Sequence, residues 1–206
     1  MTQNTSHAVM SQRVEPNDSL DFFCTPPWAT RALCEYVINI RGTVVWEPAC
    51  GEGHMAQPLK EYAHTVLASD IHDYGYGAVQ DFLWPAEVPM IDWCVTNPPF
   101  RLAEQFVKRG LEIATQGVAV LVRSVFIESA GRYEGLFRDR PPTIMAQFVE
   151  RVPMVKGRLD KNASTATSYC WLVWLVSRPA PPTYLHWIPP CRAKLERSQD
   201  YERRVA

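Results

Sequence analysis

The stretch IDWCVTNPPF, residues 91–100, is an apolar run that two consecutive prolines end abruptly. Such a run predicts a buried strand, which proline cannot continue. Asn97 is therefore expected at the carboxyl end of the strand, where open α/β sheets bind their ligands. There the Asn97 amide oxygen, the Pro98 carbonyl and the Phe100 ring could hold the exocyclic amine of a nucleobase. The alternative is a plain turn, since Asn-Pro often begins one.

Strand-like and helix-like segments alternate on both sides of this stretch, which indicates a mainly parallel α/β sheet with helices on both faces. The last two strand-like runs, 144–149 and 169–176, have no clear helix between them and are expected to pair antiparallel. The other predicted strands are 43–46, 65–69, 91–96 and 118–122, with a weak unit at 79–83, and the predicted helices are 29–38, 55–62 and 102–114.

The 206 residues, 47% of them hydrophobic and 21% charged, predict one globular domain. We expect a disordered polar tail at 1–18, the domain at 19–178, and a Pro-rich, charged tail at 179–206. The sequence contains neither a signal peptide nor a run long enough to cross a bilayer, so we expect a cytoplasmic protein without a membrane partner. Nothing in the sequence predicts its oligomeric state.

The six cysteines are dispersed without a Cys-x-x-Cys pair, and the five histidines show no metal-ligand spacing. We therefore expect neither disulfides nor a metal site. Charge is distributed unevenly, because residues 1–122 hold 7 Lys/Arg against 14 Asp/Glu whereas residues 123–206 hold 14 against 8. A basic half favours a polyanionic partner on one side of the molecule, although basic residues can also simply cover solvated surface.

A glycine-containing turn, EPACGEG at 47–53, lies between a predicted strand and a predicted helix. Gly51 and Gly53 would let the backbone approach a ligand closely. The dinucleotide pattern G-x-G-x-x-G is absent. Glu47 instead stands at the strand end, where a carboxylate suits a cationic group such as an amino-acid ammonium.

Acidic residues follow the next two units. Asp70 ends the second strand, where an acid commonly binds ribose hydroxyls, and Asp81 with Phe82 could bind and stack an adenine. Together with Glu47, these residues predict S-adenosylmethionine, a nucleoside joined to an amino acid. Solvated loop carboxylates would explain Asp70 or Asp81 alone, but not the ordered set.

Taken in order, these motifs resemble those of the class I S-adenosylmethionine-dependent methyltransferases, and of the amino-methylating DNA enzymes in particular. The resemblance covers about residues 20–178 and is strongest to small adenine-N6 methyltransferases of phages and mobile elements. It implies a Rossmann-like fold with a seven-stranded, mostly parallel sheet and an antiparallel terminal strand. The motifs that carry it are FCTP (23–26), EPACGEG (47–53), SDI (69–71), DF (81–82) and NPPF (97–100), with segments 123–128 and 169–174 in support.

The resemblance implies the site residues. The expected cofactor-binding positions are Thr25, Pro26, Glu47, Pro48, Ala49, Gly51, Gly53, Asp70, Ile71, Asp81, Phe82 and Asn97. The expected catalytic positions are Asn97, Pro98, Pro99 and Phe100. With no room for a separate target-recognition domain, we expect a basic 153–168 loop and neighbouring residues to contact DNA: Arg123, Arg132, Arg151, Lys156, Arg158 and Lys161.

The substrate remains open in part. Adenine N6 in DNA is the reading that the resemblance favours. NPPF also occurs in enzymes that methylate guanine amines in ribosomal RNA, and close variants act on cytosine N4 or on glutamine side chains. Adenine N6 in RNA is a further alternative. A catalytically silent nucleic-acid-binding protein of the same fold is the alternative from another class, and four retained site residues, Glu47, Asp70, Asp81 and Asn97, argue against it.

Overall fold

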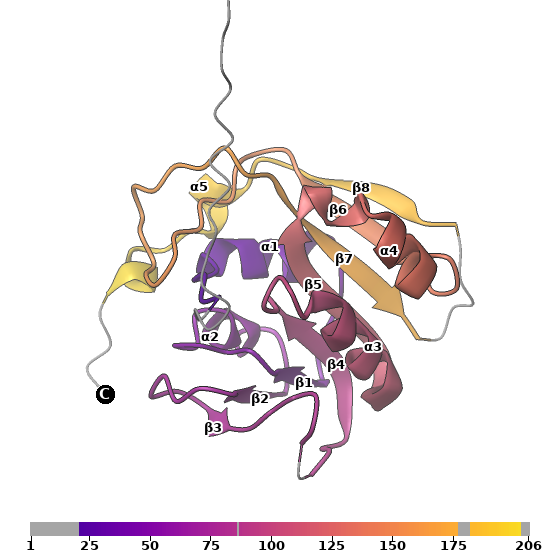
Figure 1. Ribbon diagram of the computed structural model, residues 1–206. Helices are drawn as coiled ribbons and strands as arrows, with labels where there is room; N and C mark the ends of the chain where they lie inside the picture. The colour runs from indigo at the N-terminus through magenta and orange to yellow at the C-terminus, as the bar shows by residue number, and fades with distance from the viewer. Residues whose placement is uncertain (1–20, 86, 177–181, 203–206) are drawn as a thin grey trace, which may run out of the picture.

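The computed structural model describes residues 21–85, 87–176 and 182–202. Its centre is an eight-stranded sheet in the order β3-β2-β1-β4-β5-β7-β6-β8 (Figure 1). The strands are β1 (Val44–Glu47), β2 (Thr65–Asp70), β3 (Ala78–Val79), β4 (Ile91–Thr96), β5 (Ala114–Arg123), β6 (Ile144–Phe148), β7 (Tyr169–Leu175) and β8 (Tyr184–Ile188).

The sheet is mixed in the way the sequence predicts. β1 lies between two parallel neighbours, with Val45 opposite Val66 of β2 and Trp93 of β4. β7 runs antiparallel to both β5 and β6, where Cys170 is opposite Val122 and Gln147 respectively. The predicted α/β class and the antiparallel pairing of the last two runs are therefore confirmed.

The expected strand count of seven is too low by one. β8 pairs parallel with β6 over five residues, Tyr184 to Ile188, and extends the sheet into the segment expected to be a tail. The domain therefore continues past residue 178, through α5 (Arg192–Leu195) and a 3-10 turn, Ser198–Tyr201. Alternation of apolar and polar residues is weak in β8, because it is an edge strand with only one paired side. The expected tail at 1–18 lies outside the described residues.

Helices cover both faces of the sheet (Figure 1). Along β5, Ala119 and Leu121 pack on the face of α1 (Pro27–Tyr36), whereas Val118 and Val120 pack on the face of α3 (Ala103–Ile113). This alternation follows from the two-residue period of a strand. The remaining elements are α2 (Ala56–Leu59), α4 (Ala130–Arg132), a 3-10 turn (Ser124–Ile127) and a π-helical turn (Tyr133–Phe137).

Helix α1 begins at a proline, in agreement with the preference of proline for the first turn. The residue at its N-cap position is Pro26, and no side chain bonds the free N–H groups of the first turn. Among the helices of the described ranges, none is long and apolar enough to cross a membrane.

Candidate active site

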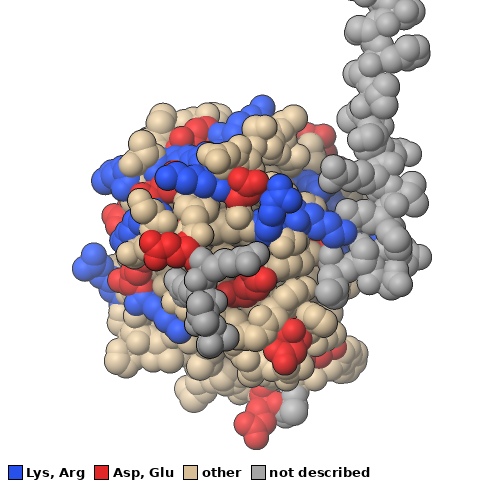
Figure 2. Space-filling view, turned by 90° about the vertical axis from the view of Figure 1, so that its left-hand side faces the viewer, with Lys and Arg blue, Asp and Glu red and all other residues tan. Residues whose placement is uncertain are grey.

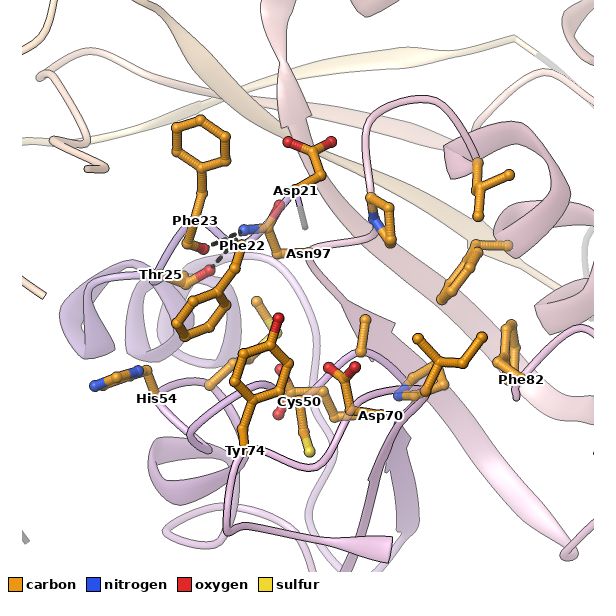
Figure 3. A pocket seen from close by; sticks show the side chains of 18 of the residues that line it. Asp21, Phe22, Phe23, Thr25, Cys50, His54, Asp70, Tyr74, Phe82 and Asn97 are labelled. Atoms are coloured by element: carbon orange, nitrogen blue, oxygen red, sulfur yellow. Dashed lines mark hydrogen bonds between the residues drawn. The ribbon is translucent and has the colours of Figure 1, made fainter. Parts of the chain in front are cut away.

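The carboxyl ends of three adjacent parallel strands meet at one edge of the sheet. Glu47 ends β1, Asp70 ends β2, and Asn97 follows the last residue of β4. All three side chains line one pocket of about 910 Å³, part of which is open to solvent. Asp70 and Asn97 are labelled in Figure 3. The strand order β2-β1-β4 therefore converts three separate sequence motifs into a single site.

The amide of Asn97 is held in one orientation. Its Nδ2 donates to the carbonyl oxygen of Phe23 at 3.0 Å and to Oγ1 of Thr25 at 3.1 Å. Its Oδ1 is buried and has no hydrogen-bond partner. Leaving a buried acceptor unpaired costs about 1–3 kcal/mol. A ligand that donates to this oxygen would recover that cost.

The backbone beyond Asn97 is fixed by a residue that the sequence analysis missed. A carboxylate oxygen of Asp21 accepts from the Phe100 N–H at 2.6 Å. Phe100 in turn packs on Phe23, with ring centroids 5.3 Å apart. The segment before α1 thus supports the NPPF turn at two places.

Glu47 is the most deeply buried carboxyl of the site, 1% exposed. One of its oxygens, Oε2, has no hydrogen-bond partner. Burial first, and the nearby Asp70 charge second, raise the pKa of Glu47 well above its ordinary value of 4.5, while a hydrogen bond from the Ala56 backbone opposes the shift. A cationic ligand group beside Glu47 would stabilise its ionised form.

Asp70 and the ring of Phe22 contact the glycine turn at Gly51. The carboxylate of Asp70 accepts from the N–H of Gly51 at 2.9 Å and from the N–H of His72 at 3.1 Å. Gly51 has a φ of +49°, and a Cβ there would meet the Phe22 ring at 2.3 Å. Phe22 packs on Tyr74 at 4.5 Å between centroids, so the two rings form one wall of the pocket.

The structure brings most, but not all, of the expected cofactor-binding and catalytic residues to the pocket. Phe82 lines it, yet its ring packs edge-on against Trp46 and lies only 2% exposed, so it forms a wall more than a free stacking surface. Ile71, 66% exposed, offers the more accessible apolar contact. The expected residues that line the pocket are Thr25, Glu47, Pro48, Ala49, Asp70, Ile71, Asp81, Phe82, Asn97 and Pro99. Those that do not are Pro26, Gly51, Gly53, Pro98 and Phe100.

Several lining residues carried no clear signal in the sequence. Asp21 and Phe22 precede the FCTP segment directly, so their proximity to that motif was the available clue. His54 lies one residue beyond the glycine turn. Tyr74 lies in a loop between β2 and β3, and no pattern in the sequence distinguishes it.

Two of the expected nucleic-acid contacts lie beside the pocket. The guanidinium of Arg123 lies over the Phe100 ring, 4.2 Å from its centroid. Lys156 forms an antiparallel bridge with Phe23, and the Gly157 N–H donates to the Phe22 carbonyl at 2.9 Å. The 153–168 segment is thus attached to the residues that support Asn97.

The other basic candidates make contacts within the protein. Arg132 donates to the Phe126 carbonyl at 2.7 Å, and Arg151 to that of Ala166 at 3.0 Å. Arg158 pairs with Asp160 at 3.2 Å, and the Lys161 ammonium lies 5.9 Å from the Tyr201 ring. Figure 2 shows Lys and Arg toward the upper part of one face, mixed with Asp and Glu, while the lowest part carries acidic and uncharged side chains.

Comparisons with known proteins identify the fold. No family model matches the chain, and no curated protein does. The type I restriction-modification methyltransferase subunit from Streptococcus thermophilus aligns with a TM-score of 0.55 at 12% identity, over 78% of this chain and 45% of that one. The 23S rRNA methyltransferase ErmE aligns with a TM-score of 0.52 at 18% identity, over 78% and 72%.

A third similar structure is named for the methylation of oxygen. A SAM-dependent O-methyltransferase from Thermotoga maritima aligns with a TM-score of 0.51 at 13% identity, over 75% of this chain and 66% of that one. At such low identities the similarity establishes the architecture, which is the Rossmann-like fold of class I methyltransferases. Because one fold supports several substrates, the substrate has to be argued from the site.

Proposed function

We propose that this protein transfers a methyl group from S-adenosylmethionine to the exocyclic amine of a nucleobase, adenine N6 in DNA. The observation that carries the proposal is the orientation of Asn97, whose donor side is bound within the protein and whose buried acceptor is left without a partner. An acceptor presented in this way is suited to an N–H group of a substrate.

The other end of the pocket suits the cofactor. Glu47 offers a buried, unpaired carboxylate oxygen, which fits the ammonium of an amino acid. Asp70, at the end of β2, would bind ribose hydroxyls, and Asp81 with the exposed Ile71 would contact an adenine ring; all three line the pocket. S-adenosylmethionine, when bound, supplies an electrophilic methyl group.

The protein's part in the reaction is to orient the amine toward the methyl group. An exocyclic adenine amine is a weak nucleophile because its lone pair is delocalised into the ring. Asn97 Oδ1 and the Pro98 carbonyl would accept its two N–H bonds and direct the lone pair toward the methyl group. Positioning and preorganised acceptors then lower the barrier without a strong general base.

Phe100 would stack on the target base once that base has left the duplex. Flipping costs a few kcal/mol, and base–aromatic stacking returns about 1–3 kcal/mol. One face of the Phe100 ring already carries the Arg123 guanidinium. Because the Phe100 ring also packs on Phe23, the base would use the part of the ring that both neighbours leave free, or it would displace the guanidinium.

DNA is the proposed nucleic-acid substrate. RNA is the alternative, since the same methyl transfer to a base amine is possible there. Support for a polyanion comes from the basic C-terminal half and from the position of Arg123 and Lys156 beside the pocket. Similar folds named for restriction-modification and for ribosomal RNA methylation agree with either nucleic acid.

A methyl-transfer assay decides among these substrates. Tritiated S-adenosylmethionine is incubated with the protein and with DNA or RNA, and the products are digested to nucleosides and separated. We expect label in N6-methyladenine from DNA. Label in guanine N2, in cytosine N4 or only in RNA would replace the substrate assignment, and cofactor binding without any transfer would favour a silent nucleic-acid-binding protein.

A further inference from the structure

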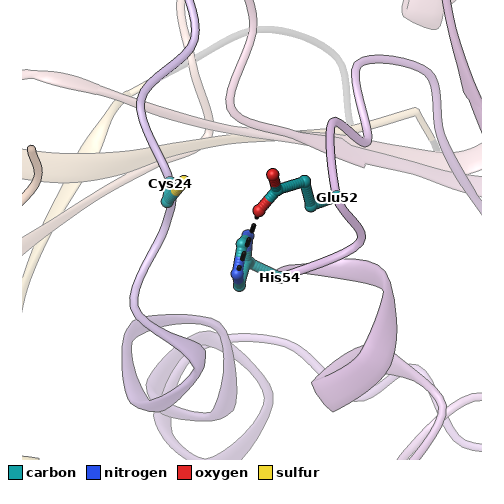
Figure 4. Close-up of side chains that lie close together, drawn as sticks. All are labelled: Cys24, Glu52 and His54. Carbon is teal, nitrogen blue, oxygen red and sulfur yellow. Dashed lines mark ion pairs between the residues drawn. The ribbon is translucent and has the colours of Figure 1, made fainter. Parts of the chain in front are cut away.

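Three side chains with metal-ligating atoms meet at the mouth of the pocket. Cys24 comes from the segment before α1, Glu52 comes from the glycine turn after β1, and His54 directly follows that turn (Figure 4). One ligand atom from each, the Cys24 sulfur, a Glu52 carboxylate oxygen and a His54 ring nitrogen, lie within 4.8 Å of one another. His54 Nε2 and Glu52 Oε2 are 3.8 Å apart.

These distances are close to those of a tetrahedral metal site. With metal–sulfur bonds of about 2.3 Å and metal–nitrogen or metal–oxygen bonds of about 2.0–2.1 Å, neighbouring ligand atoms lie about 3.3–3.6 Å apart. To reach this spacing from their present separations, the ligand atoms would each have to move by about 1 Å or less. The Glu52 side chain is 51% exposed, so its carboxylate can turn without disturbing the core.

We infer that Cys24, Glu52 and His54 bind one divalent transition-metal ion, of which zinc is the best match. Thiolate, imidazole and carboxylate together suit zinc and its cobalt substitute, whereas magnesium and calcium prefer oxygen ligands alone. Three protein ligands leave a fourth position for water or for another molecule. Because Cys24 and His54 also line the pocket, the ion would lie beside the ligand space.

The charges of the site balance on binding. A thiolate and a carboxylate neutralise a divalent cation, and the imidazole binds in its neutral form. The thiolate, not the thiol, is the form of cysteine that binds a metal. The sulfur–metal bond therefore forms as the S–H proton passes to solvent.

A metal ion bound here would link two segments of the chain, the one around Cys24 and the one around Glu52. The segment around Cys24 supplies Phe23 and Thr25, the acceptors that hold Asn97, and the turn around Glu52 supplies the Gly51 N–H that binds Asp70. The ion would tie the acceptor side of the pocket to the glycine turn. This inference does not depend on the proposed function, because metal binding is measured without any methyl transfer.

Cobalt titration of the full chain tests the site. The protein is stripped with a chelator and titrated with Co²⁺, and the thiolate-to-cobalt charge-transfer absorption in the near ultraviolet is followed; Zn²⁺ is then added in competition. We expect one Co²⁺ per chain, a thiolate band, and loss of the band on addition of Zn²⁺.

Two variants test the proposed ligands, and a third is the control. Cys24→Ser should abolish the thiolate band, and Glu52→Gln should weaken Co²⁺ binding at least about tenfold. Glu52→Gln changes an exposed side chain, so it reports on the site even if Cys24→Ser fails to fold. Cys34→Ser is the matched control, since Cys34 is a free thiol on α1 outside the cluster, and it should keep the band.

Three results would overturn the inference. These are the absence of a thiolate band in the unaltered protein, a band that persists in Cys24→Ser, and a Co²⁺ affinity unchanged in Glu52→Gln.

Discussion

The Asn97 amide and the Thr25 hydroxyl, 72 positions apart in the chain, are joined by a hydrogen bond of 3.1 Å from Asn97 Nδ2 to Thr25 Oγ1. With the Phe23 carbonyl as a second acceptor, both amide hydrogens of Asn97 are used. Only Oδ1 is left to meet a substrate. The FCTP segment therefore acts on the acceptor end of the site, in addition to lining the pocket.

Asn97→Ala removes this acceptor. We expect methyl transfer to fall at least about 100- to 1000-fold, as for other single donors or acceptors aimed at a reacting group, with cofactor binding nearly intact. Single-turnover transfer and calorimetry measure the two effects. Asn39→Ala is the control, because Asn39 lies in an exposed turn near the amino end of β1. Unchanged turnover in Asn97→Ala would reject this active site.

Asp70→Ala should weaken cofactor binding by about 10- to 100-fold, the loss expected for hydrogen bonds to a charged group. Part of the loss comes from the glycine turn, whose Gly51 N–H loses its partner. Asp73→Ala is a nearby control, since the Asp73 carboxylate accepts from the N–H of Gly75 in an exposed loop. Normal calorimetric affinity in Asp70→Ala would exclude the ribose role.

Glu47 should make both stability and cofactor affinity depend on pH. Its pKa is raised in the folded state, so between 4.5 and that raised value the folded protein keeps a proton that the unfolded chain has lost. The stability of the cofactor-free protein therefore falls as pH rises through this window. A cationic ligand favours ionised Glu47, so cofactor affinity rises with pH through the same window.

The substitution Glu47→Gln should flatten both dependences. Thermal unfolding with and without cofactor, from about pH 5 to pH 8, measures them. Glu112→Gln, which changes an exposed carboxylate on α3, should behave like the unaltered protein. Parallel pH profiles for Glu47→Gln and the unaltered protein would show that Glu47 is not the titrating group.

Asp21→Ala should slow methyl transfer about 10- to 100-fold with little change in cofactor affinity, because the Phe100 N–H loses its charged partner. Asp21→Asn retains an oxygen acceptor and should restore most of the rate. This pattern identifies Asp21 as a positioning residue. Equal loss in both variants would instead indicate that the charge itself acts on the substrate.

Nucleic-acid binding should weaken steeply with added salt. Lys156→Ala should lower the slope of log affinity against log salt by about one, the change expected for one lost phosphate contact. Lys108→Ala is the control, because Lys108 is paired with Glu104 on α3. Fluorescence anisotropy with a labelled duplex gives both slopes, and a salt-independent affinity would contradict a phosphate interface at the pocket.

Much of the fold could be predicted because it depends on local patterns. Apolar runs of strand length, turns rich in Gly or Pro, and the alternation of strands with helices are properties of neighbouring residues. β8 escaped prediction because an edge strand with one paired side has a weak pattern: Tyr184, Leu185 and Trp187 are all exposed. The hydrogen bond between Thr25 and Asn97 could not be predicted, since a threonine just before a helix is equally typical of an N-cap.

The sequence by itself determined that Glu47, Asp70 and Asn97 stand at strand ends, and parallel pairing then places such ends at one edge of the sheet. Only the tertiary structure decided which atoms of these residues remain available. The Asn97 amide is oriented by Phe23 and Thr25, and Cys24 meets Glu52 and His54 across two loops. Such contacts join segments distant in the chain, and their geometry depends on how whole helices and strands pack. The spacing of neighbouring residues in the sequence does not predict this packing.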